Sequence, residues 1–459
     1  MGEDYVSVAG RVRRNSGWRR AGRRAPDAPA DGCVAAAAFR RPRPRRSWQY
    51  SPVDKAEFYR NARTDLSGPM AGVRVLEVTT SWAGPMAGCV LADLGAEVIK
   101  CEMPAGEMSR HMPVKVPGSS LAFLNQAANR NKRSLTLDLR VAEGTELFLQ
   151  LAAVSDIVVE NFLPGTLARW GVGYEQCRAV KDDIVYVSIS GWGQFGPESH
   201  RAGYDPIAQA ASGWMAANGP TDGEPCKGPT YLCDDLAGLH GAIGAMAALH
   251  HRNRTGEGQH VDSSLLDAVL FQSNGFLSLA AMGVPIARMG SEVTITCPVN
   301  TYTCADGYLY LAIALDAHWV KLCEAMGRPE LISAPGFATN TARCDNRDAV
   351  NAAVSDWCIS QPVVTAVARL SAAGVAVAKV DTYEDAARNP HVLERDMLQD
   401  TVLEDGTVAP LTGPALKFSR TPTRVRHASR ALGADTDSLL AELGLNDAAV
   451  AALRARGAV

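Results

Sequence analysis

Apolar residues along this chain fall into short β-branched runs that alternate with stretches of helical spacing. Residues 73–78 have the pattern of a buried strand, residues 83–94 carry apolar side chains at helical spacing, and residues 96–101 resemble a second strand. The alternation continues through strand-like 134–139, 156–162 and 184–190 and helical 142–154 and 166–178. A strand, a helix and a second strand in succession require a right-handed crossover and parallel pairing. The pattern predicts an α/β fold with an open, Rossmann-like parallel sheet whose ligand lies at the carboxyl ends of the strands.

The second half of the chain predicts elements beyond this sheet. A long helix is expected over 236–252, and residues 260–283 begin as a strand and continue as a helix. Residues 284–307 are rich in Gly, Pro and Thr and predict a loop before strand-like 307–315 and helical 316–326. We therefore expect four parts: an N-terminal extension (1–69), the first part of a large domain (70–289), a smaller α/β domain (290–395) and a C-terminal segment that returns to the large domain (396–459).

Composition narrows the class of protein. A chain of 459 residues with 47% hydrophobic content can bury a substantial core. The most apolar stretch is interrupted by Asp267, Gln272 and Asn274, so no membrane span is predicted. The 11 cysteines include no C-x-x-C pair, which predicts no metal site. No signal peptide is recognisable, and we expect reduced thiols in a cytoplasmic protein.

The first 46 residues differ from the rest in charge. They hold twelve arginines and four acids, a net charge of +8, which leaves −11 for the remainder of a chain whose total is −3. Such a segment cannot bury enough apolar surface to offset its ordering entropy, so it predicts a basic, disordered extension. A targeting peptide, a nucleic-acid-binding arm and a true start at Met70 are the alternatives.

A glycine-rich turn follows the strand-like run that ends at residue 190. Gly191, Gly193 and Gly196 have the G-x-G-x-x-G spacing of a dinucleotide-binding turn. The third glycine of such a turn must open a helix, so that amide groups meet the pyrophosphate. Here Pro197 and Pro206 follow instead, and an irregular loop is expected. The sequence therefore argues against a dinucleotide site.

Six segments, in this order, resemble another family. They are "LEVTTSWAGPMAGCVLADLGAEVIKCE", "NRNKRSLTLDLR", "SDIVVENFLPGTLARWG", "SISGWGQFGP" with "GYDPIAQAASG", "DDLAGLHGAIGAMAALHHRNRTGEGQHVDSSLLDA" and "GVAVAKVDTYEDAARNPHV". The chain is similar to the class III (family III) CoA-transferases, which include formyl-CoA transferase and carnitine CoA-transferase. The resemblance implies CoA and acyl-CoA as substrates, no permanently bound cofactor, no metal, no nucleic-acid partner and an interlocked homodimer.

Asp234 is the principal candidate for catalysis. Its position before the long predicted helix favours an N-cap, because an aspartate there accepts hydrogen bonds from unpaired backbone N–H groups. The residue also matches the family's D-x-x-x-G motif with Gly238, and the resemblance implies that it is the nucleophile. The implied reaction moves CoA from an acyl-CoA to a free carboxylic acid through an aspartyl mixed anhydride and an aspartyl-CoA thioester. Asp235 is the neighbouring alternative, which the spacing to Gly238 disfavours.

The resemblance also assigns residues around this aspartate. Asp205 stands where relatives have an assisting acid, although an Asx turn before Pro206 explains it equally well. Tyr204 replaces the histidine base of the 2-methylacyl-CoA racemases, and an unperturbed tyrosine is a poor base near neutrality. His200 and His240 could substitute for that base. A racemase and a non-catalytic CoA-binding subunit of a heteromeric transferase therefore remain as alternatives.

The residues implied to contact CoA lie mainly after the predicted strands. They are Trp82, Ala83, Leu137, Asp138, Leu139, Arg140, Asn161, Phe162 and Arg169. Arginines suit the phosphates of CoA, although both could be solvated surface residues. Trp82 and Met103 depart from the glutamine and arginine of formyl-CoA transferase, which favours a bulkier, more apolar acyl group. The glycine-rich lid of some relatives corresponds to "ARMGSEVTITCPVNTY", which has one glycine.

Overall fold

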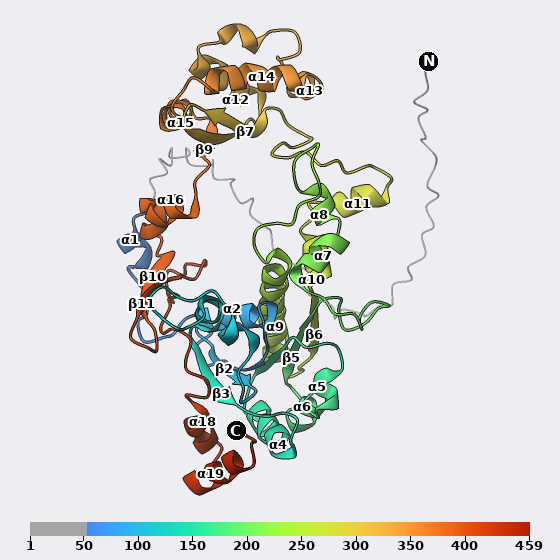
Figure 1. Ribbon diagram of the computed structural model, residues 1–459, viewed down its shortest axis with the longest axis vertical. Coiled ribbons are helices and arrows are strands. Elements are labelled where there is room, and N and C mark those ends of the chain that lie inside the picture. The colour runs from blue at the N-terminus through green and yellow to red at the C-terminus, as the bar shows by residue number, and fades with distance from the viewer. Residues whose placement is uncertain (1–52) are drawn as a thin grey trace, which may run out of the picture. The chain divides into compact units, whose positions relative to one another are not determined.

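The computed structural model describes residues 53–459 (Figure 1). Residues 1–52, most of the predicted extension, lie outside the described residues. Helix α1 (Lys55–Tyr59) falls inside the extension, so the expected disorder is wrong for 53–69. Asp54 caps α1 by accepting a hydrogen bond from the Glu57 amide at 2.7 Å, and Lys55 pairs with Asp396 at 2.9 Å. The first contact is local and the second joins residues far apart in the sequence. Both are polar, so the pattern of apolar residues did not predict this helix.

A six-stranded parallel sheet forms the framework of the large domain. Its strands are β1 (Arg74–Val78), β2 (Glu97–Glu102), β3 (Lys132–Thr136), β4 (Ile157–Glu160), β5 (Val185–Ser190) and β6 (His260–Ser264). Their order across the sheet is β3-β2-β1-β4-β5-β6, and every neighbouring pair is parallel. The central register pairs Leu76 with Ile99 on one side and with Val158 on the other. The predicted α/β fold with a Rossmann-like parallel sheet is confirmed.

Both faces of this sheet are covered, which explains the continuous apolar strands. Val75 and Val159 face one buried cluster, together with α2 (Ala83–Asp93) and α9 (Leu232–Thr255). Leu76 and Val158 face the other. Helices α4 (Ala142–Ala153), α6 (Tyr174–Val180), α18 (Thr436–Glu442) and α19 (Asp447–Ala455) contribute to that second cluster. The C-terminal residues thus pack with the sheet, as Figure 1 shows for α18 and α19 below β3.

Helix α9 is the central helix of the large domain. Within residues 53–459 it is the helix that is long and apolar enough to cross a membrane, but it packs on α2, β5 and β6 as a core helix. Its glycines permit this close approach: a Cβ on Gly238 would lie 2.7 Å from the Ala83 carbonyl oxygen, and one on Gly241 2.8 Å from the Ile189 side chain. The helix begins four residues earlier than the predicted 236.

A separate core occupies the smaller domain. Antiparallel strands β7 (Val299–Cys304), β8 (Gly307–Ala312) and β9 (Ala376–Lys379) are covered by helices that include α12 (Asp316–Met326), α14 (Arg347–Cys358) and α15 (Val363–Ala372). Its core includes the buried Tyr302 and Trp319. Strand β7 lies inside the predicted loop 284–307, so that prediction is wrong at its end, because Val299, Tyr302 and Cys304 bury their side chains.

Shorter elements complete the described chain. They are η1 (Met108–His111), α3 (Phe123–Asn129), α5 (Thr166–Arg169), α7 (Asp205–Ala211), α8 (Trp214–Ala217), α10 (Leu265–Phe271), α11 (Phe276–Ala281), η2 (Pro329–Ile332), α13 (Asn340–Asp345), α16 (Tyr383–Arg388), α17 (Pro390–Glu394), β10 (Leu398–Val402) and β11 (Val408–Thr412). The single helix predicted over 166–178 is divided into α5 and α6, because Gly171 takes a φ of +83° between them. The predicted domain boundaries stay predictions.

Candidate active site

Asp234 lies in the first turn of α9, and it does not cap that helix. The N-cap position is Tyr231, because α9 begins at Leu232. Asp205 performs the capping function from a distance: its Oδ1 accepts a hydrogen bond from the Cys233 amide at 2.7 Å, and its Oδ2 accepts one from Gln209 at 2.8 Å. The N-cap interpretation of Asp234 is therefore wrong, and its carboxylate makes no hydrogen bond to another residue in the part of the chain that the structure describes.

Three carboxyl groups meet at this end of α9. Burial raises the pKa of Asp234 to about 7, and the nearby negative charges of Asp205 and Asp235 add to the shift. Burial also raises the pKa of Asp235, but a hydrogen bond from the Trp82 indole, 2.6 Å long, opposes the shift. Asp235 is thus engaged by a donor. Asp234 has no such donor among the described residues, which leaves its carboxylate available to a ligand.

Asp234 opens into a cavity of roughly 240 Å³ at the carboxyl ends of the central strands. Its lining includes Trp82, Ala83, Asn161 and Phe162, four of the residues that the sequence assigns to CoA. Among the described residues, Asp234 is the one charged residue that lines this cavity. A second cavity of roughly 190 Å³ is lined by the predicted Leu137 and Leu139, and it shares residues with the first: Thr80, Met108 and Phe162. The shared residues make the two cavities neighbours.

The remaining predicted CoA residues lie outside both cavities. Arg140 pairs with Asp138 at 2.7 Å and is exposed, whereas Arg169 is exposed and donates to the Thr166 hydroxyl at 3.0 Å. Their assignment to the phosphates of CoA stays a prediction. Asn161 lines the first cavity, but its side-chain amide is already hydrogen-bonded to the backbone of Thr80. The amide oxygen accepts from the Thr80 N–H and the amide nitrogen donates to the Thr80 carbonyl, each at 2.9 Å.

The glycine-rich turn forms the far wall of the cavity around Asp234. β5 ends at Ser190 and the next helix, α7, begins only at Asp205, so no helix opens at Gly196 and the predicted irregular loop is confirmed. The ends of the loop meet closely: a Cβ on Gly191 would lie 2.6 Å from the Gly203 Cα. Gly191, Gly203 and the 60% exposed Tyr204 line the cavity. The glycines thus allow a loop to close beside Asp234.

The segment that corresponds to the relatives' lid is held by side chains. Glu292 accepts hydrogen bonds from Asn300 at 3.0 Å and from Asn351, and pairs with Arg347 at 3.2 Å. Tyr310 also donates to the Ser291 carbonyl at 3.0 Å. These contacts tie residues 291 and 292 to the core of the smaller domain.

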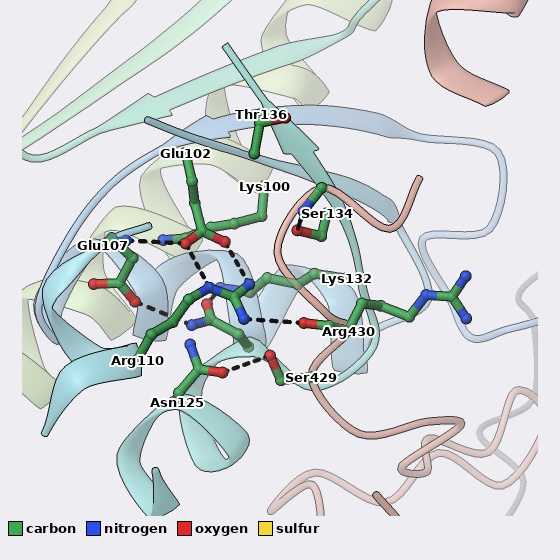
Figure 2. Close-up of polar contacts among 12 residues, drawn as sticks. Lys100, Glu102, Glu107, Arg110, Asn125, Lys132, Ser134, Thr136, Ser429 and Arg430 are labelled. Carbon is green, nitrogen blue, oxygen red and sulfur yellow. Dashed lines mark hydrogen bonds and ion pairs between the residues drawn. The ribbon is translucent and has the colours of Figure 1, made fainter. Parts of the chain in front are cut away.

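A buried cluster of charged residues borders the second cavity, which Glu102 and Glu107 line, and the sequence pattern did not predict it (Figure 2). Glu77 pairs with Lys100 at 2.9 Å and with Lys132 at 2.8 Å, and all three side chains are almost inaccessible to solvent. The sequence held a signal, because Glu77 and Lys100 each stand between two apolar residues inside a predicted buried strand. Only the fold shows that neighbouring strands bring them together.

Comparisons with known proteins point to one class. The model of CoA-transferase family III matches residues 70–436. Succinate–glutarate CoA-transferase of Agrobacterium fabrum is 35% identical over 82% of this chain and 96% of its own length. The β-subunit of succinyl-CoA–L-malate CoA-transferase of Chloroflexus aurantiacus is 33% identical over 86% of this chain and 98% of that relative. The crystal structure of a CaiB/BaiF family protein from Brucella suis matches with a TM-score of 0.73 and 35% identity, covering 82% of this chain and all of that one.

Proposed function

This chain belongs to CoA-transferase family III and is a CoA-transferase, and we propose that it moves CoA between carboxylic acids through covalent intermediates on Asp234. The observation that most strongly supports this proposal is the position of Asp234. Its carboxylate lies in the first turn of α9, in the cavity that Trp82, Ala83 and Phe162 line, without a hydrogen bond to another described residue. A nucleophile needs such access, and an engaged carboxylate such as Asp235 lacks it.

The reaction has two symmetrical halves. An Asp234 oxygen attacks the thioester carbonyl of the acyl-CoA; the C–S bond breaks, and CoA leaves as a thiolate with the bonding electrons. The thiolate then attacks the aspartyl carbonyl of the mixed anhydride, which forms the aspartyl-CoA thioester and releases the first acid as a carboxylate. A second carboxylate attacks this thioester, and the same two steps in reverse deliver its acyl-CoA and restore Asp234. The cycle consumes no proton and no electron overall.

The anhydride steps pass through oxyanions that require hydrogen-bond donors. We assign this role to the backbone N–H groups of Gly203 and Tyr204. Both residues line the cavity, and neither amide bonds to another residue among those that the structure describes. The glycine at 203 supports this assignment, because its backbone lies against Gly191 where a side chain would not fit.

For substrates we propose succinyl-CoA as donor and a second dicarboxylic acid as acceptor. The names of the Agrobacterium and Chloroflexus relatives support this choice. The cavity lining contains no lysine or arginine within residues 53–459, so the hydroxyls of Ser190 and Tyr204 are the proposed partners of the second carboxylate. An apolar acyl group, which Trp82 favours, is the competing donor class.

A homodimer is the proposed assembly. Large apolar side chains project from neighbouring helices: Ile243 on α9 is 56% exposed, Phe271 on α10 is 77% exposed and Leu277 on α11 is 53% exposed. Such a concentration is typical of an interface. Sedimentation or light scattering of the purified chain tests this assembly. A monomer that becomes active only with a second, different chain would favour the heteromeric alternative.

Trapping of the intermediate tests the proposal. The protein is mixed with succinyl-CoA and, separately, with apolar acyl-CoAs, and its intact mass is measured before and after hydroxylamine treatment. We expect an adduct that hydroxylamine converts to a hydroxamate on the peptide containing Asp234, in the wild type and in Asp235→Asn but not in Asp234→Asn. Transferase activity retained by Asp234→Asn would contradict the proposal. Deuterium from solvent at the acyl α-carbon without transfer would instead indicate the racemase.

A further inference from the structure

The charged cluster beside the second cavity has equal numbers of anions and cations, and it reaches the turn between β1 and α2. It contains three carboxylates and three cations, all buried or nearly so: Glu77, Glu102 and Glu107 with Lys100, Arg110 and Lys132. Arg110 binds both oxygens of Glu102, at 2.6 and 2.7 Å, and donates to the Arg430 carbonyl, as Figure 2 shows. Glu107 differs from the other two carboxylates, because it has no salt-bridge partner among the described residues and contacts the backbone after β1.

Hydrogen bonds to other residues fix each backbone position of the turn between β1 and α2, from Thr79 to Ser81. Lys100 donates to the Thr79 carbonyl at 2.8 Å, and Asn161 bonds both backbone groups of Thr80. Oε2 of Glu107 accepts from the Ser81 amide at 3.1 Å. Ser81 needs this support, because it takes a φ of +67°, a left-handed conformation that a side chain disfavours.

Glu107 is itself fixed. The same oxygen accepts from the Ser109 amide at 2.9 Å, and the other accepts from the Ser109 hydroxyl and from Asn129 at 3.3 Å. Burial acts to raise the pKa of Glu107, but Lys100 and the Ser109 and Ser81 hydrogen bonds hold the pKa below its ordinary value. The group therefore stays an anion that accepts hydrogen bonds from the turn.

The conformation of this turn determines where the next residue, Trp82, lies relative to Asp234. Trp82 follows Ser81 directly, lines the cavity with Asp234 and donates its indole N–H to Asp235, the neighbour of Asp234. A contact chain thus runs from Glu107 through Ser81 and Trp82 to the end of α9. If Ser81 relaxed to a negative φ, the path of the chain into α2 would change and Trp82 would lose its position.

We propose that Glu107 is a positioning residue of CoA transfer, which holds Ser81 in its left-handed conformation so that Trp82 forms one wall of the site beside Asp234. This inference rests on the proposed role of Asp234. Glu107 need not touch the reacting atoms, because a small misplacement of groups around a nucleophile is enough to slow a reaction by about a hundredfold.

The test is a double-mutant cycle between Glu107 and Ser81. Glu107→Gln removes the charge and weakens the grip on the Ser81 amide. Ser81→Gly removes the penalty of the positive φ, so that the turn keeps its conformation with less support. We expect Glu107→Gln to lower kcat by about 10- to 100-fold with a much smaller change in KM for the acyl-CoA, and Ser81→Gly to restore most of that loss.

A matched control separates positioning from general stability. Ser155→Ala removes a buried hydrogen bond of 2.8 Å to the Leu151 carbonyl, beyond the end of α4, and this contact involves no residue of the charged cluster or of the turn. It should lower the Tm without changing kcat. If Glu107→Gln proves too unstable to purify, Asn161→Ala releases Thr80 from the other side of the turn, and Ser81→Gly should rescue it likewise.

Failure of this inference is distinguishable from failure of the proposed function. If the wild type forms no adduct at Asp234, the proposed function is wrong. If the wild type forms the adduct and folded Glu107→Gln forms it at the wild-type rate, the positioning role is wrong. A loss of activity that Ser81→Gly leaves unrescued would also overturn it, since a purely structural role for Glu107 predicts that outcome.

Discussion

Two carboxylate clusters in the large domain differ in their partners. Glu77 lies between Lys100 and Lys132 under the sheet's helical cover, whereas Asp234 shares the end of α9 with two other acids. Burial acts to raise the pKa of Glu77, but the two lysines outweigh it and hold the pKa below its ordinary value. Burial raises the pKa of Asp234 to about 7, and within the described residues no cation pairs with it, since Lys227 lies 4.0 Å from Asp205 instead. A buried carboxylate with matched cations stabilises a fold, and one left without them is available for chemistry.

The two clusters also make opposite contributions to the pH dependence of stability. Between about pH 4 and pH 7 the folded chain keeps a proton on Asp234 that the unfolded chain has lost, so this group lowers stability as pH rises. Glu77 has a lowered pKa, so its contribution is present above the unfolded value and is lost as the pH falls through its folded pKa. The reactive group therefore costs stability at the pH where it is ionised.

The largest expected effect is the loss of catalysis when the cluster of Asp205, Asp234 and Asp235 is changed. Asp234→Asn should lower kcat by roughly 10⁴-fold or more while leaving the Tm equal or higher, because the proposed nucleophile is lost and a buried charge with it. Steady-state kinetics and thermal unfolding measure both quantities. Asp235→Asn is the matched control, with a loss of roughly 10-fold, since asparagine keeps an oxygen that accepts the Trp82 hydrogen bond and removes only the charge that strengthens it. Equal losses in the two variants would contradict the assignment of roles.

Substitutions in the cluster around Glu77 should change the stability of the protein. Glu77→Gln leaves Lys100 and Lys132 without their shared anion, and we expect the free energy of unfolding to fall by about 3–5 kcal/mol. Denaturant titration measures this change. Glu97→Gln is the control, because Glu97 pairs with Arg74 and Arg133 near the surface and should cost less than about 1 kcal/mol. A comparable loss in both variants would mean that burial does not distinguish the clusters.

Packing around Glu77 gives a smaller, steric test. A Cβ on Gly88 of α2 would lie 1.8 Å from Glu77 Oε2 and 3.1 Å from Lys132 Nζ. Gly88→Ala should therefore destabilise the protein by about 1–3 kcal/mol, although alanine favours a helix. Gly307→Ala, whose Cβ would meet Val363 at an ordinary 3.6 Å, should change stability by less than about 0.5 kcal/mol. Denaturant midpoints of both variants decide the sign.

The smallest expected effect is the titration of Asp234. Only the carboxylate attacks, so kcat/KM should rise with pH, reach about half its maximal value near pH 7 and level off above about pH 8. Asp205→Asn removes one of the negative charges that raise the pKa of Asp234, and its profile should shift to lower pH. A pH–rate profile between pH 5 and pH 9 measures both. A profile that is flat below pH 7 would contradict ionisation of Asp234 as the controlling step.

Local patterns predicted most of the parallel sheet, because buried strands and amphipathic helices leave a periodic record in the sequence. They failed where structure depends on partners distant along the chain. Strand β7 was missed because its burial comes from the smaller domain's core, and α1 because Asp396 holds it from the other end of the chain. The helix 166–178 was divided by glycine conformations that composition alone does not fix.

The sequence by itself determined the α/β fold, the family and the identity of Asp234 as the candidate nucleophile, because motifs and periodicity are carried by residues close together in the chain. Only the tertiary structure decided that Asp205 caps α9 while Asp234 does not, and that Asp235 is engaged by Trp82. It also decided that Glu107 meets Ser81 across the sheet edge. Hydrogen bonds and pKa values depend on distances of a few ångströms between residues far apart in sequence, and only the folded chain sets those distances.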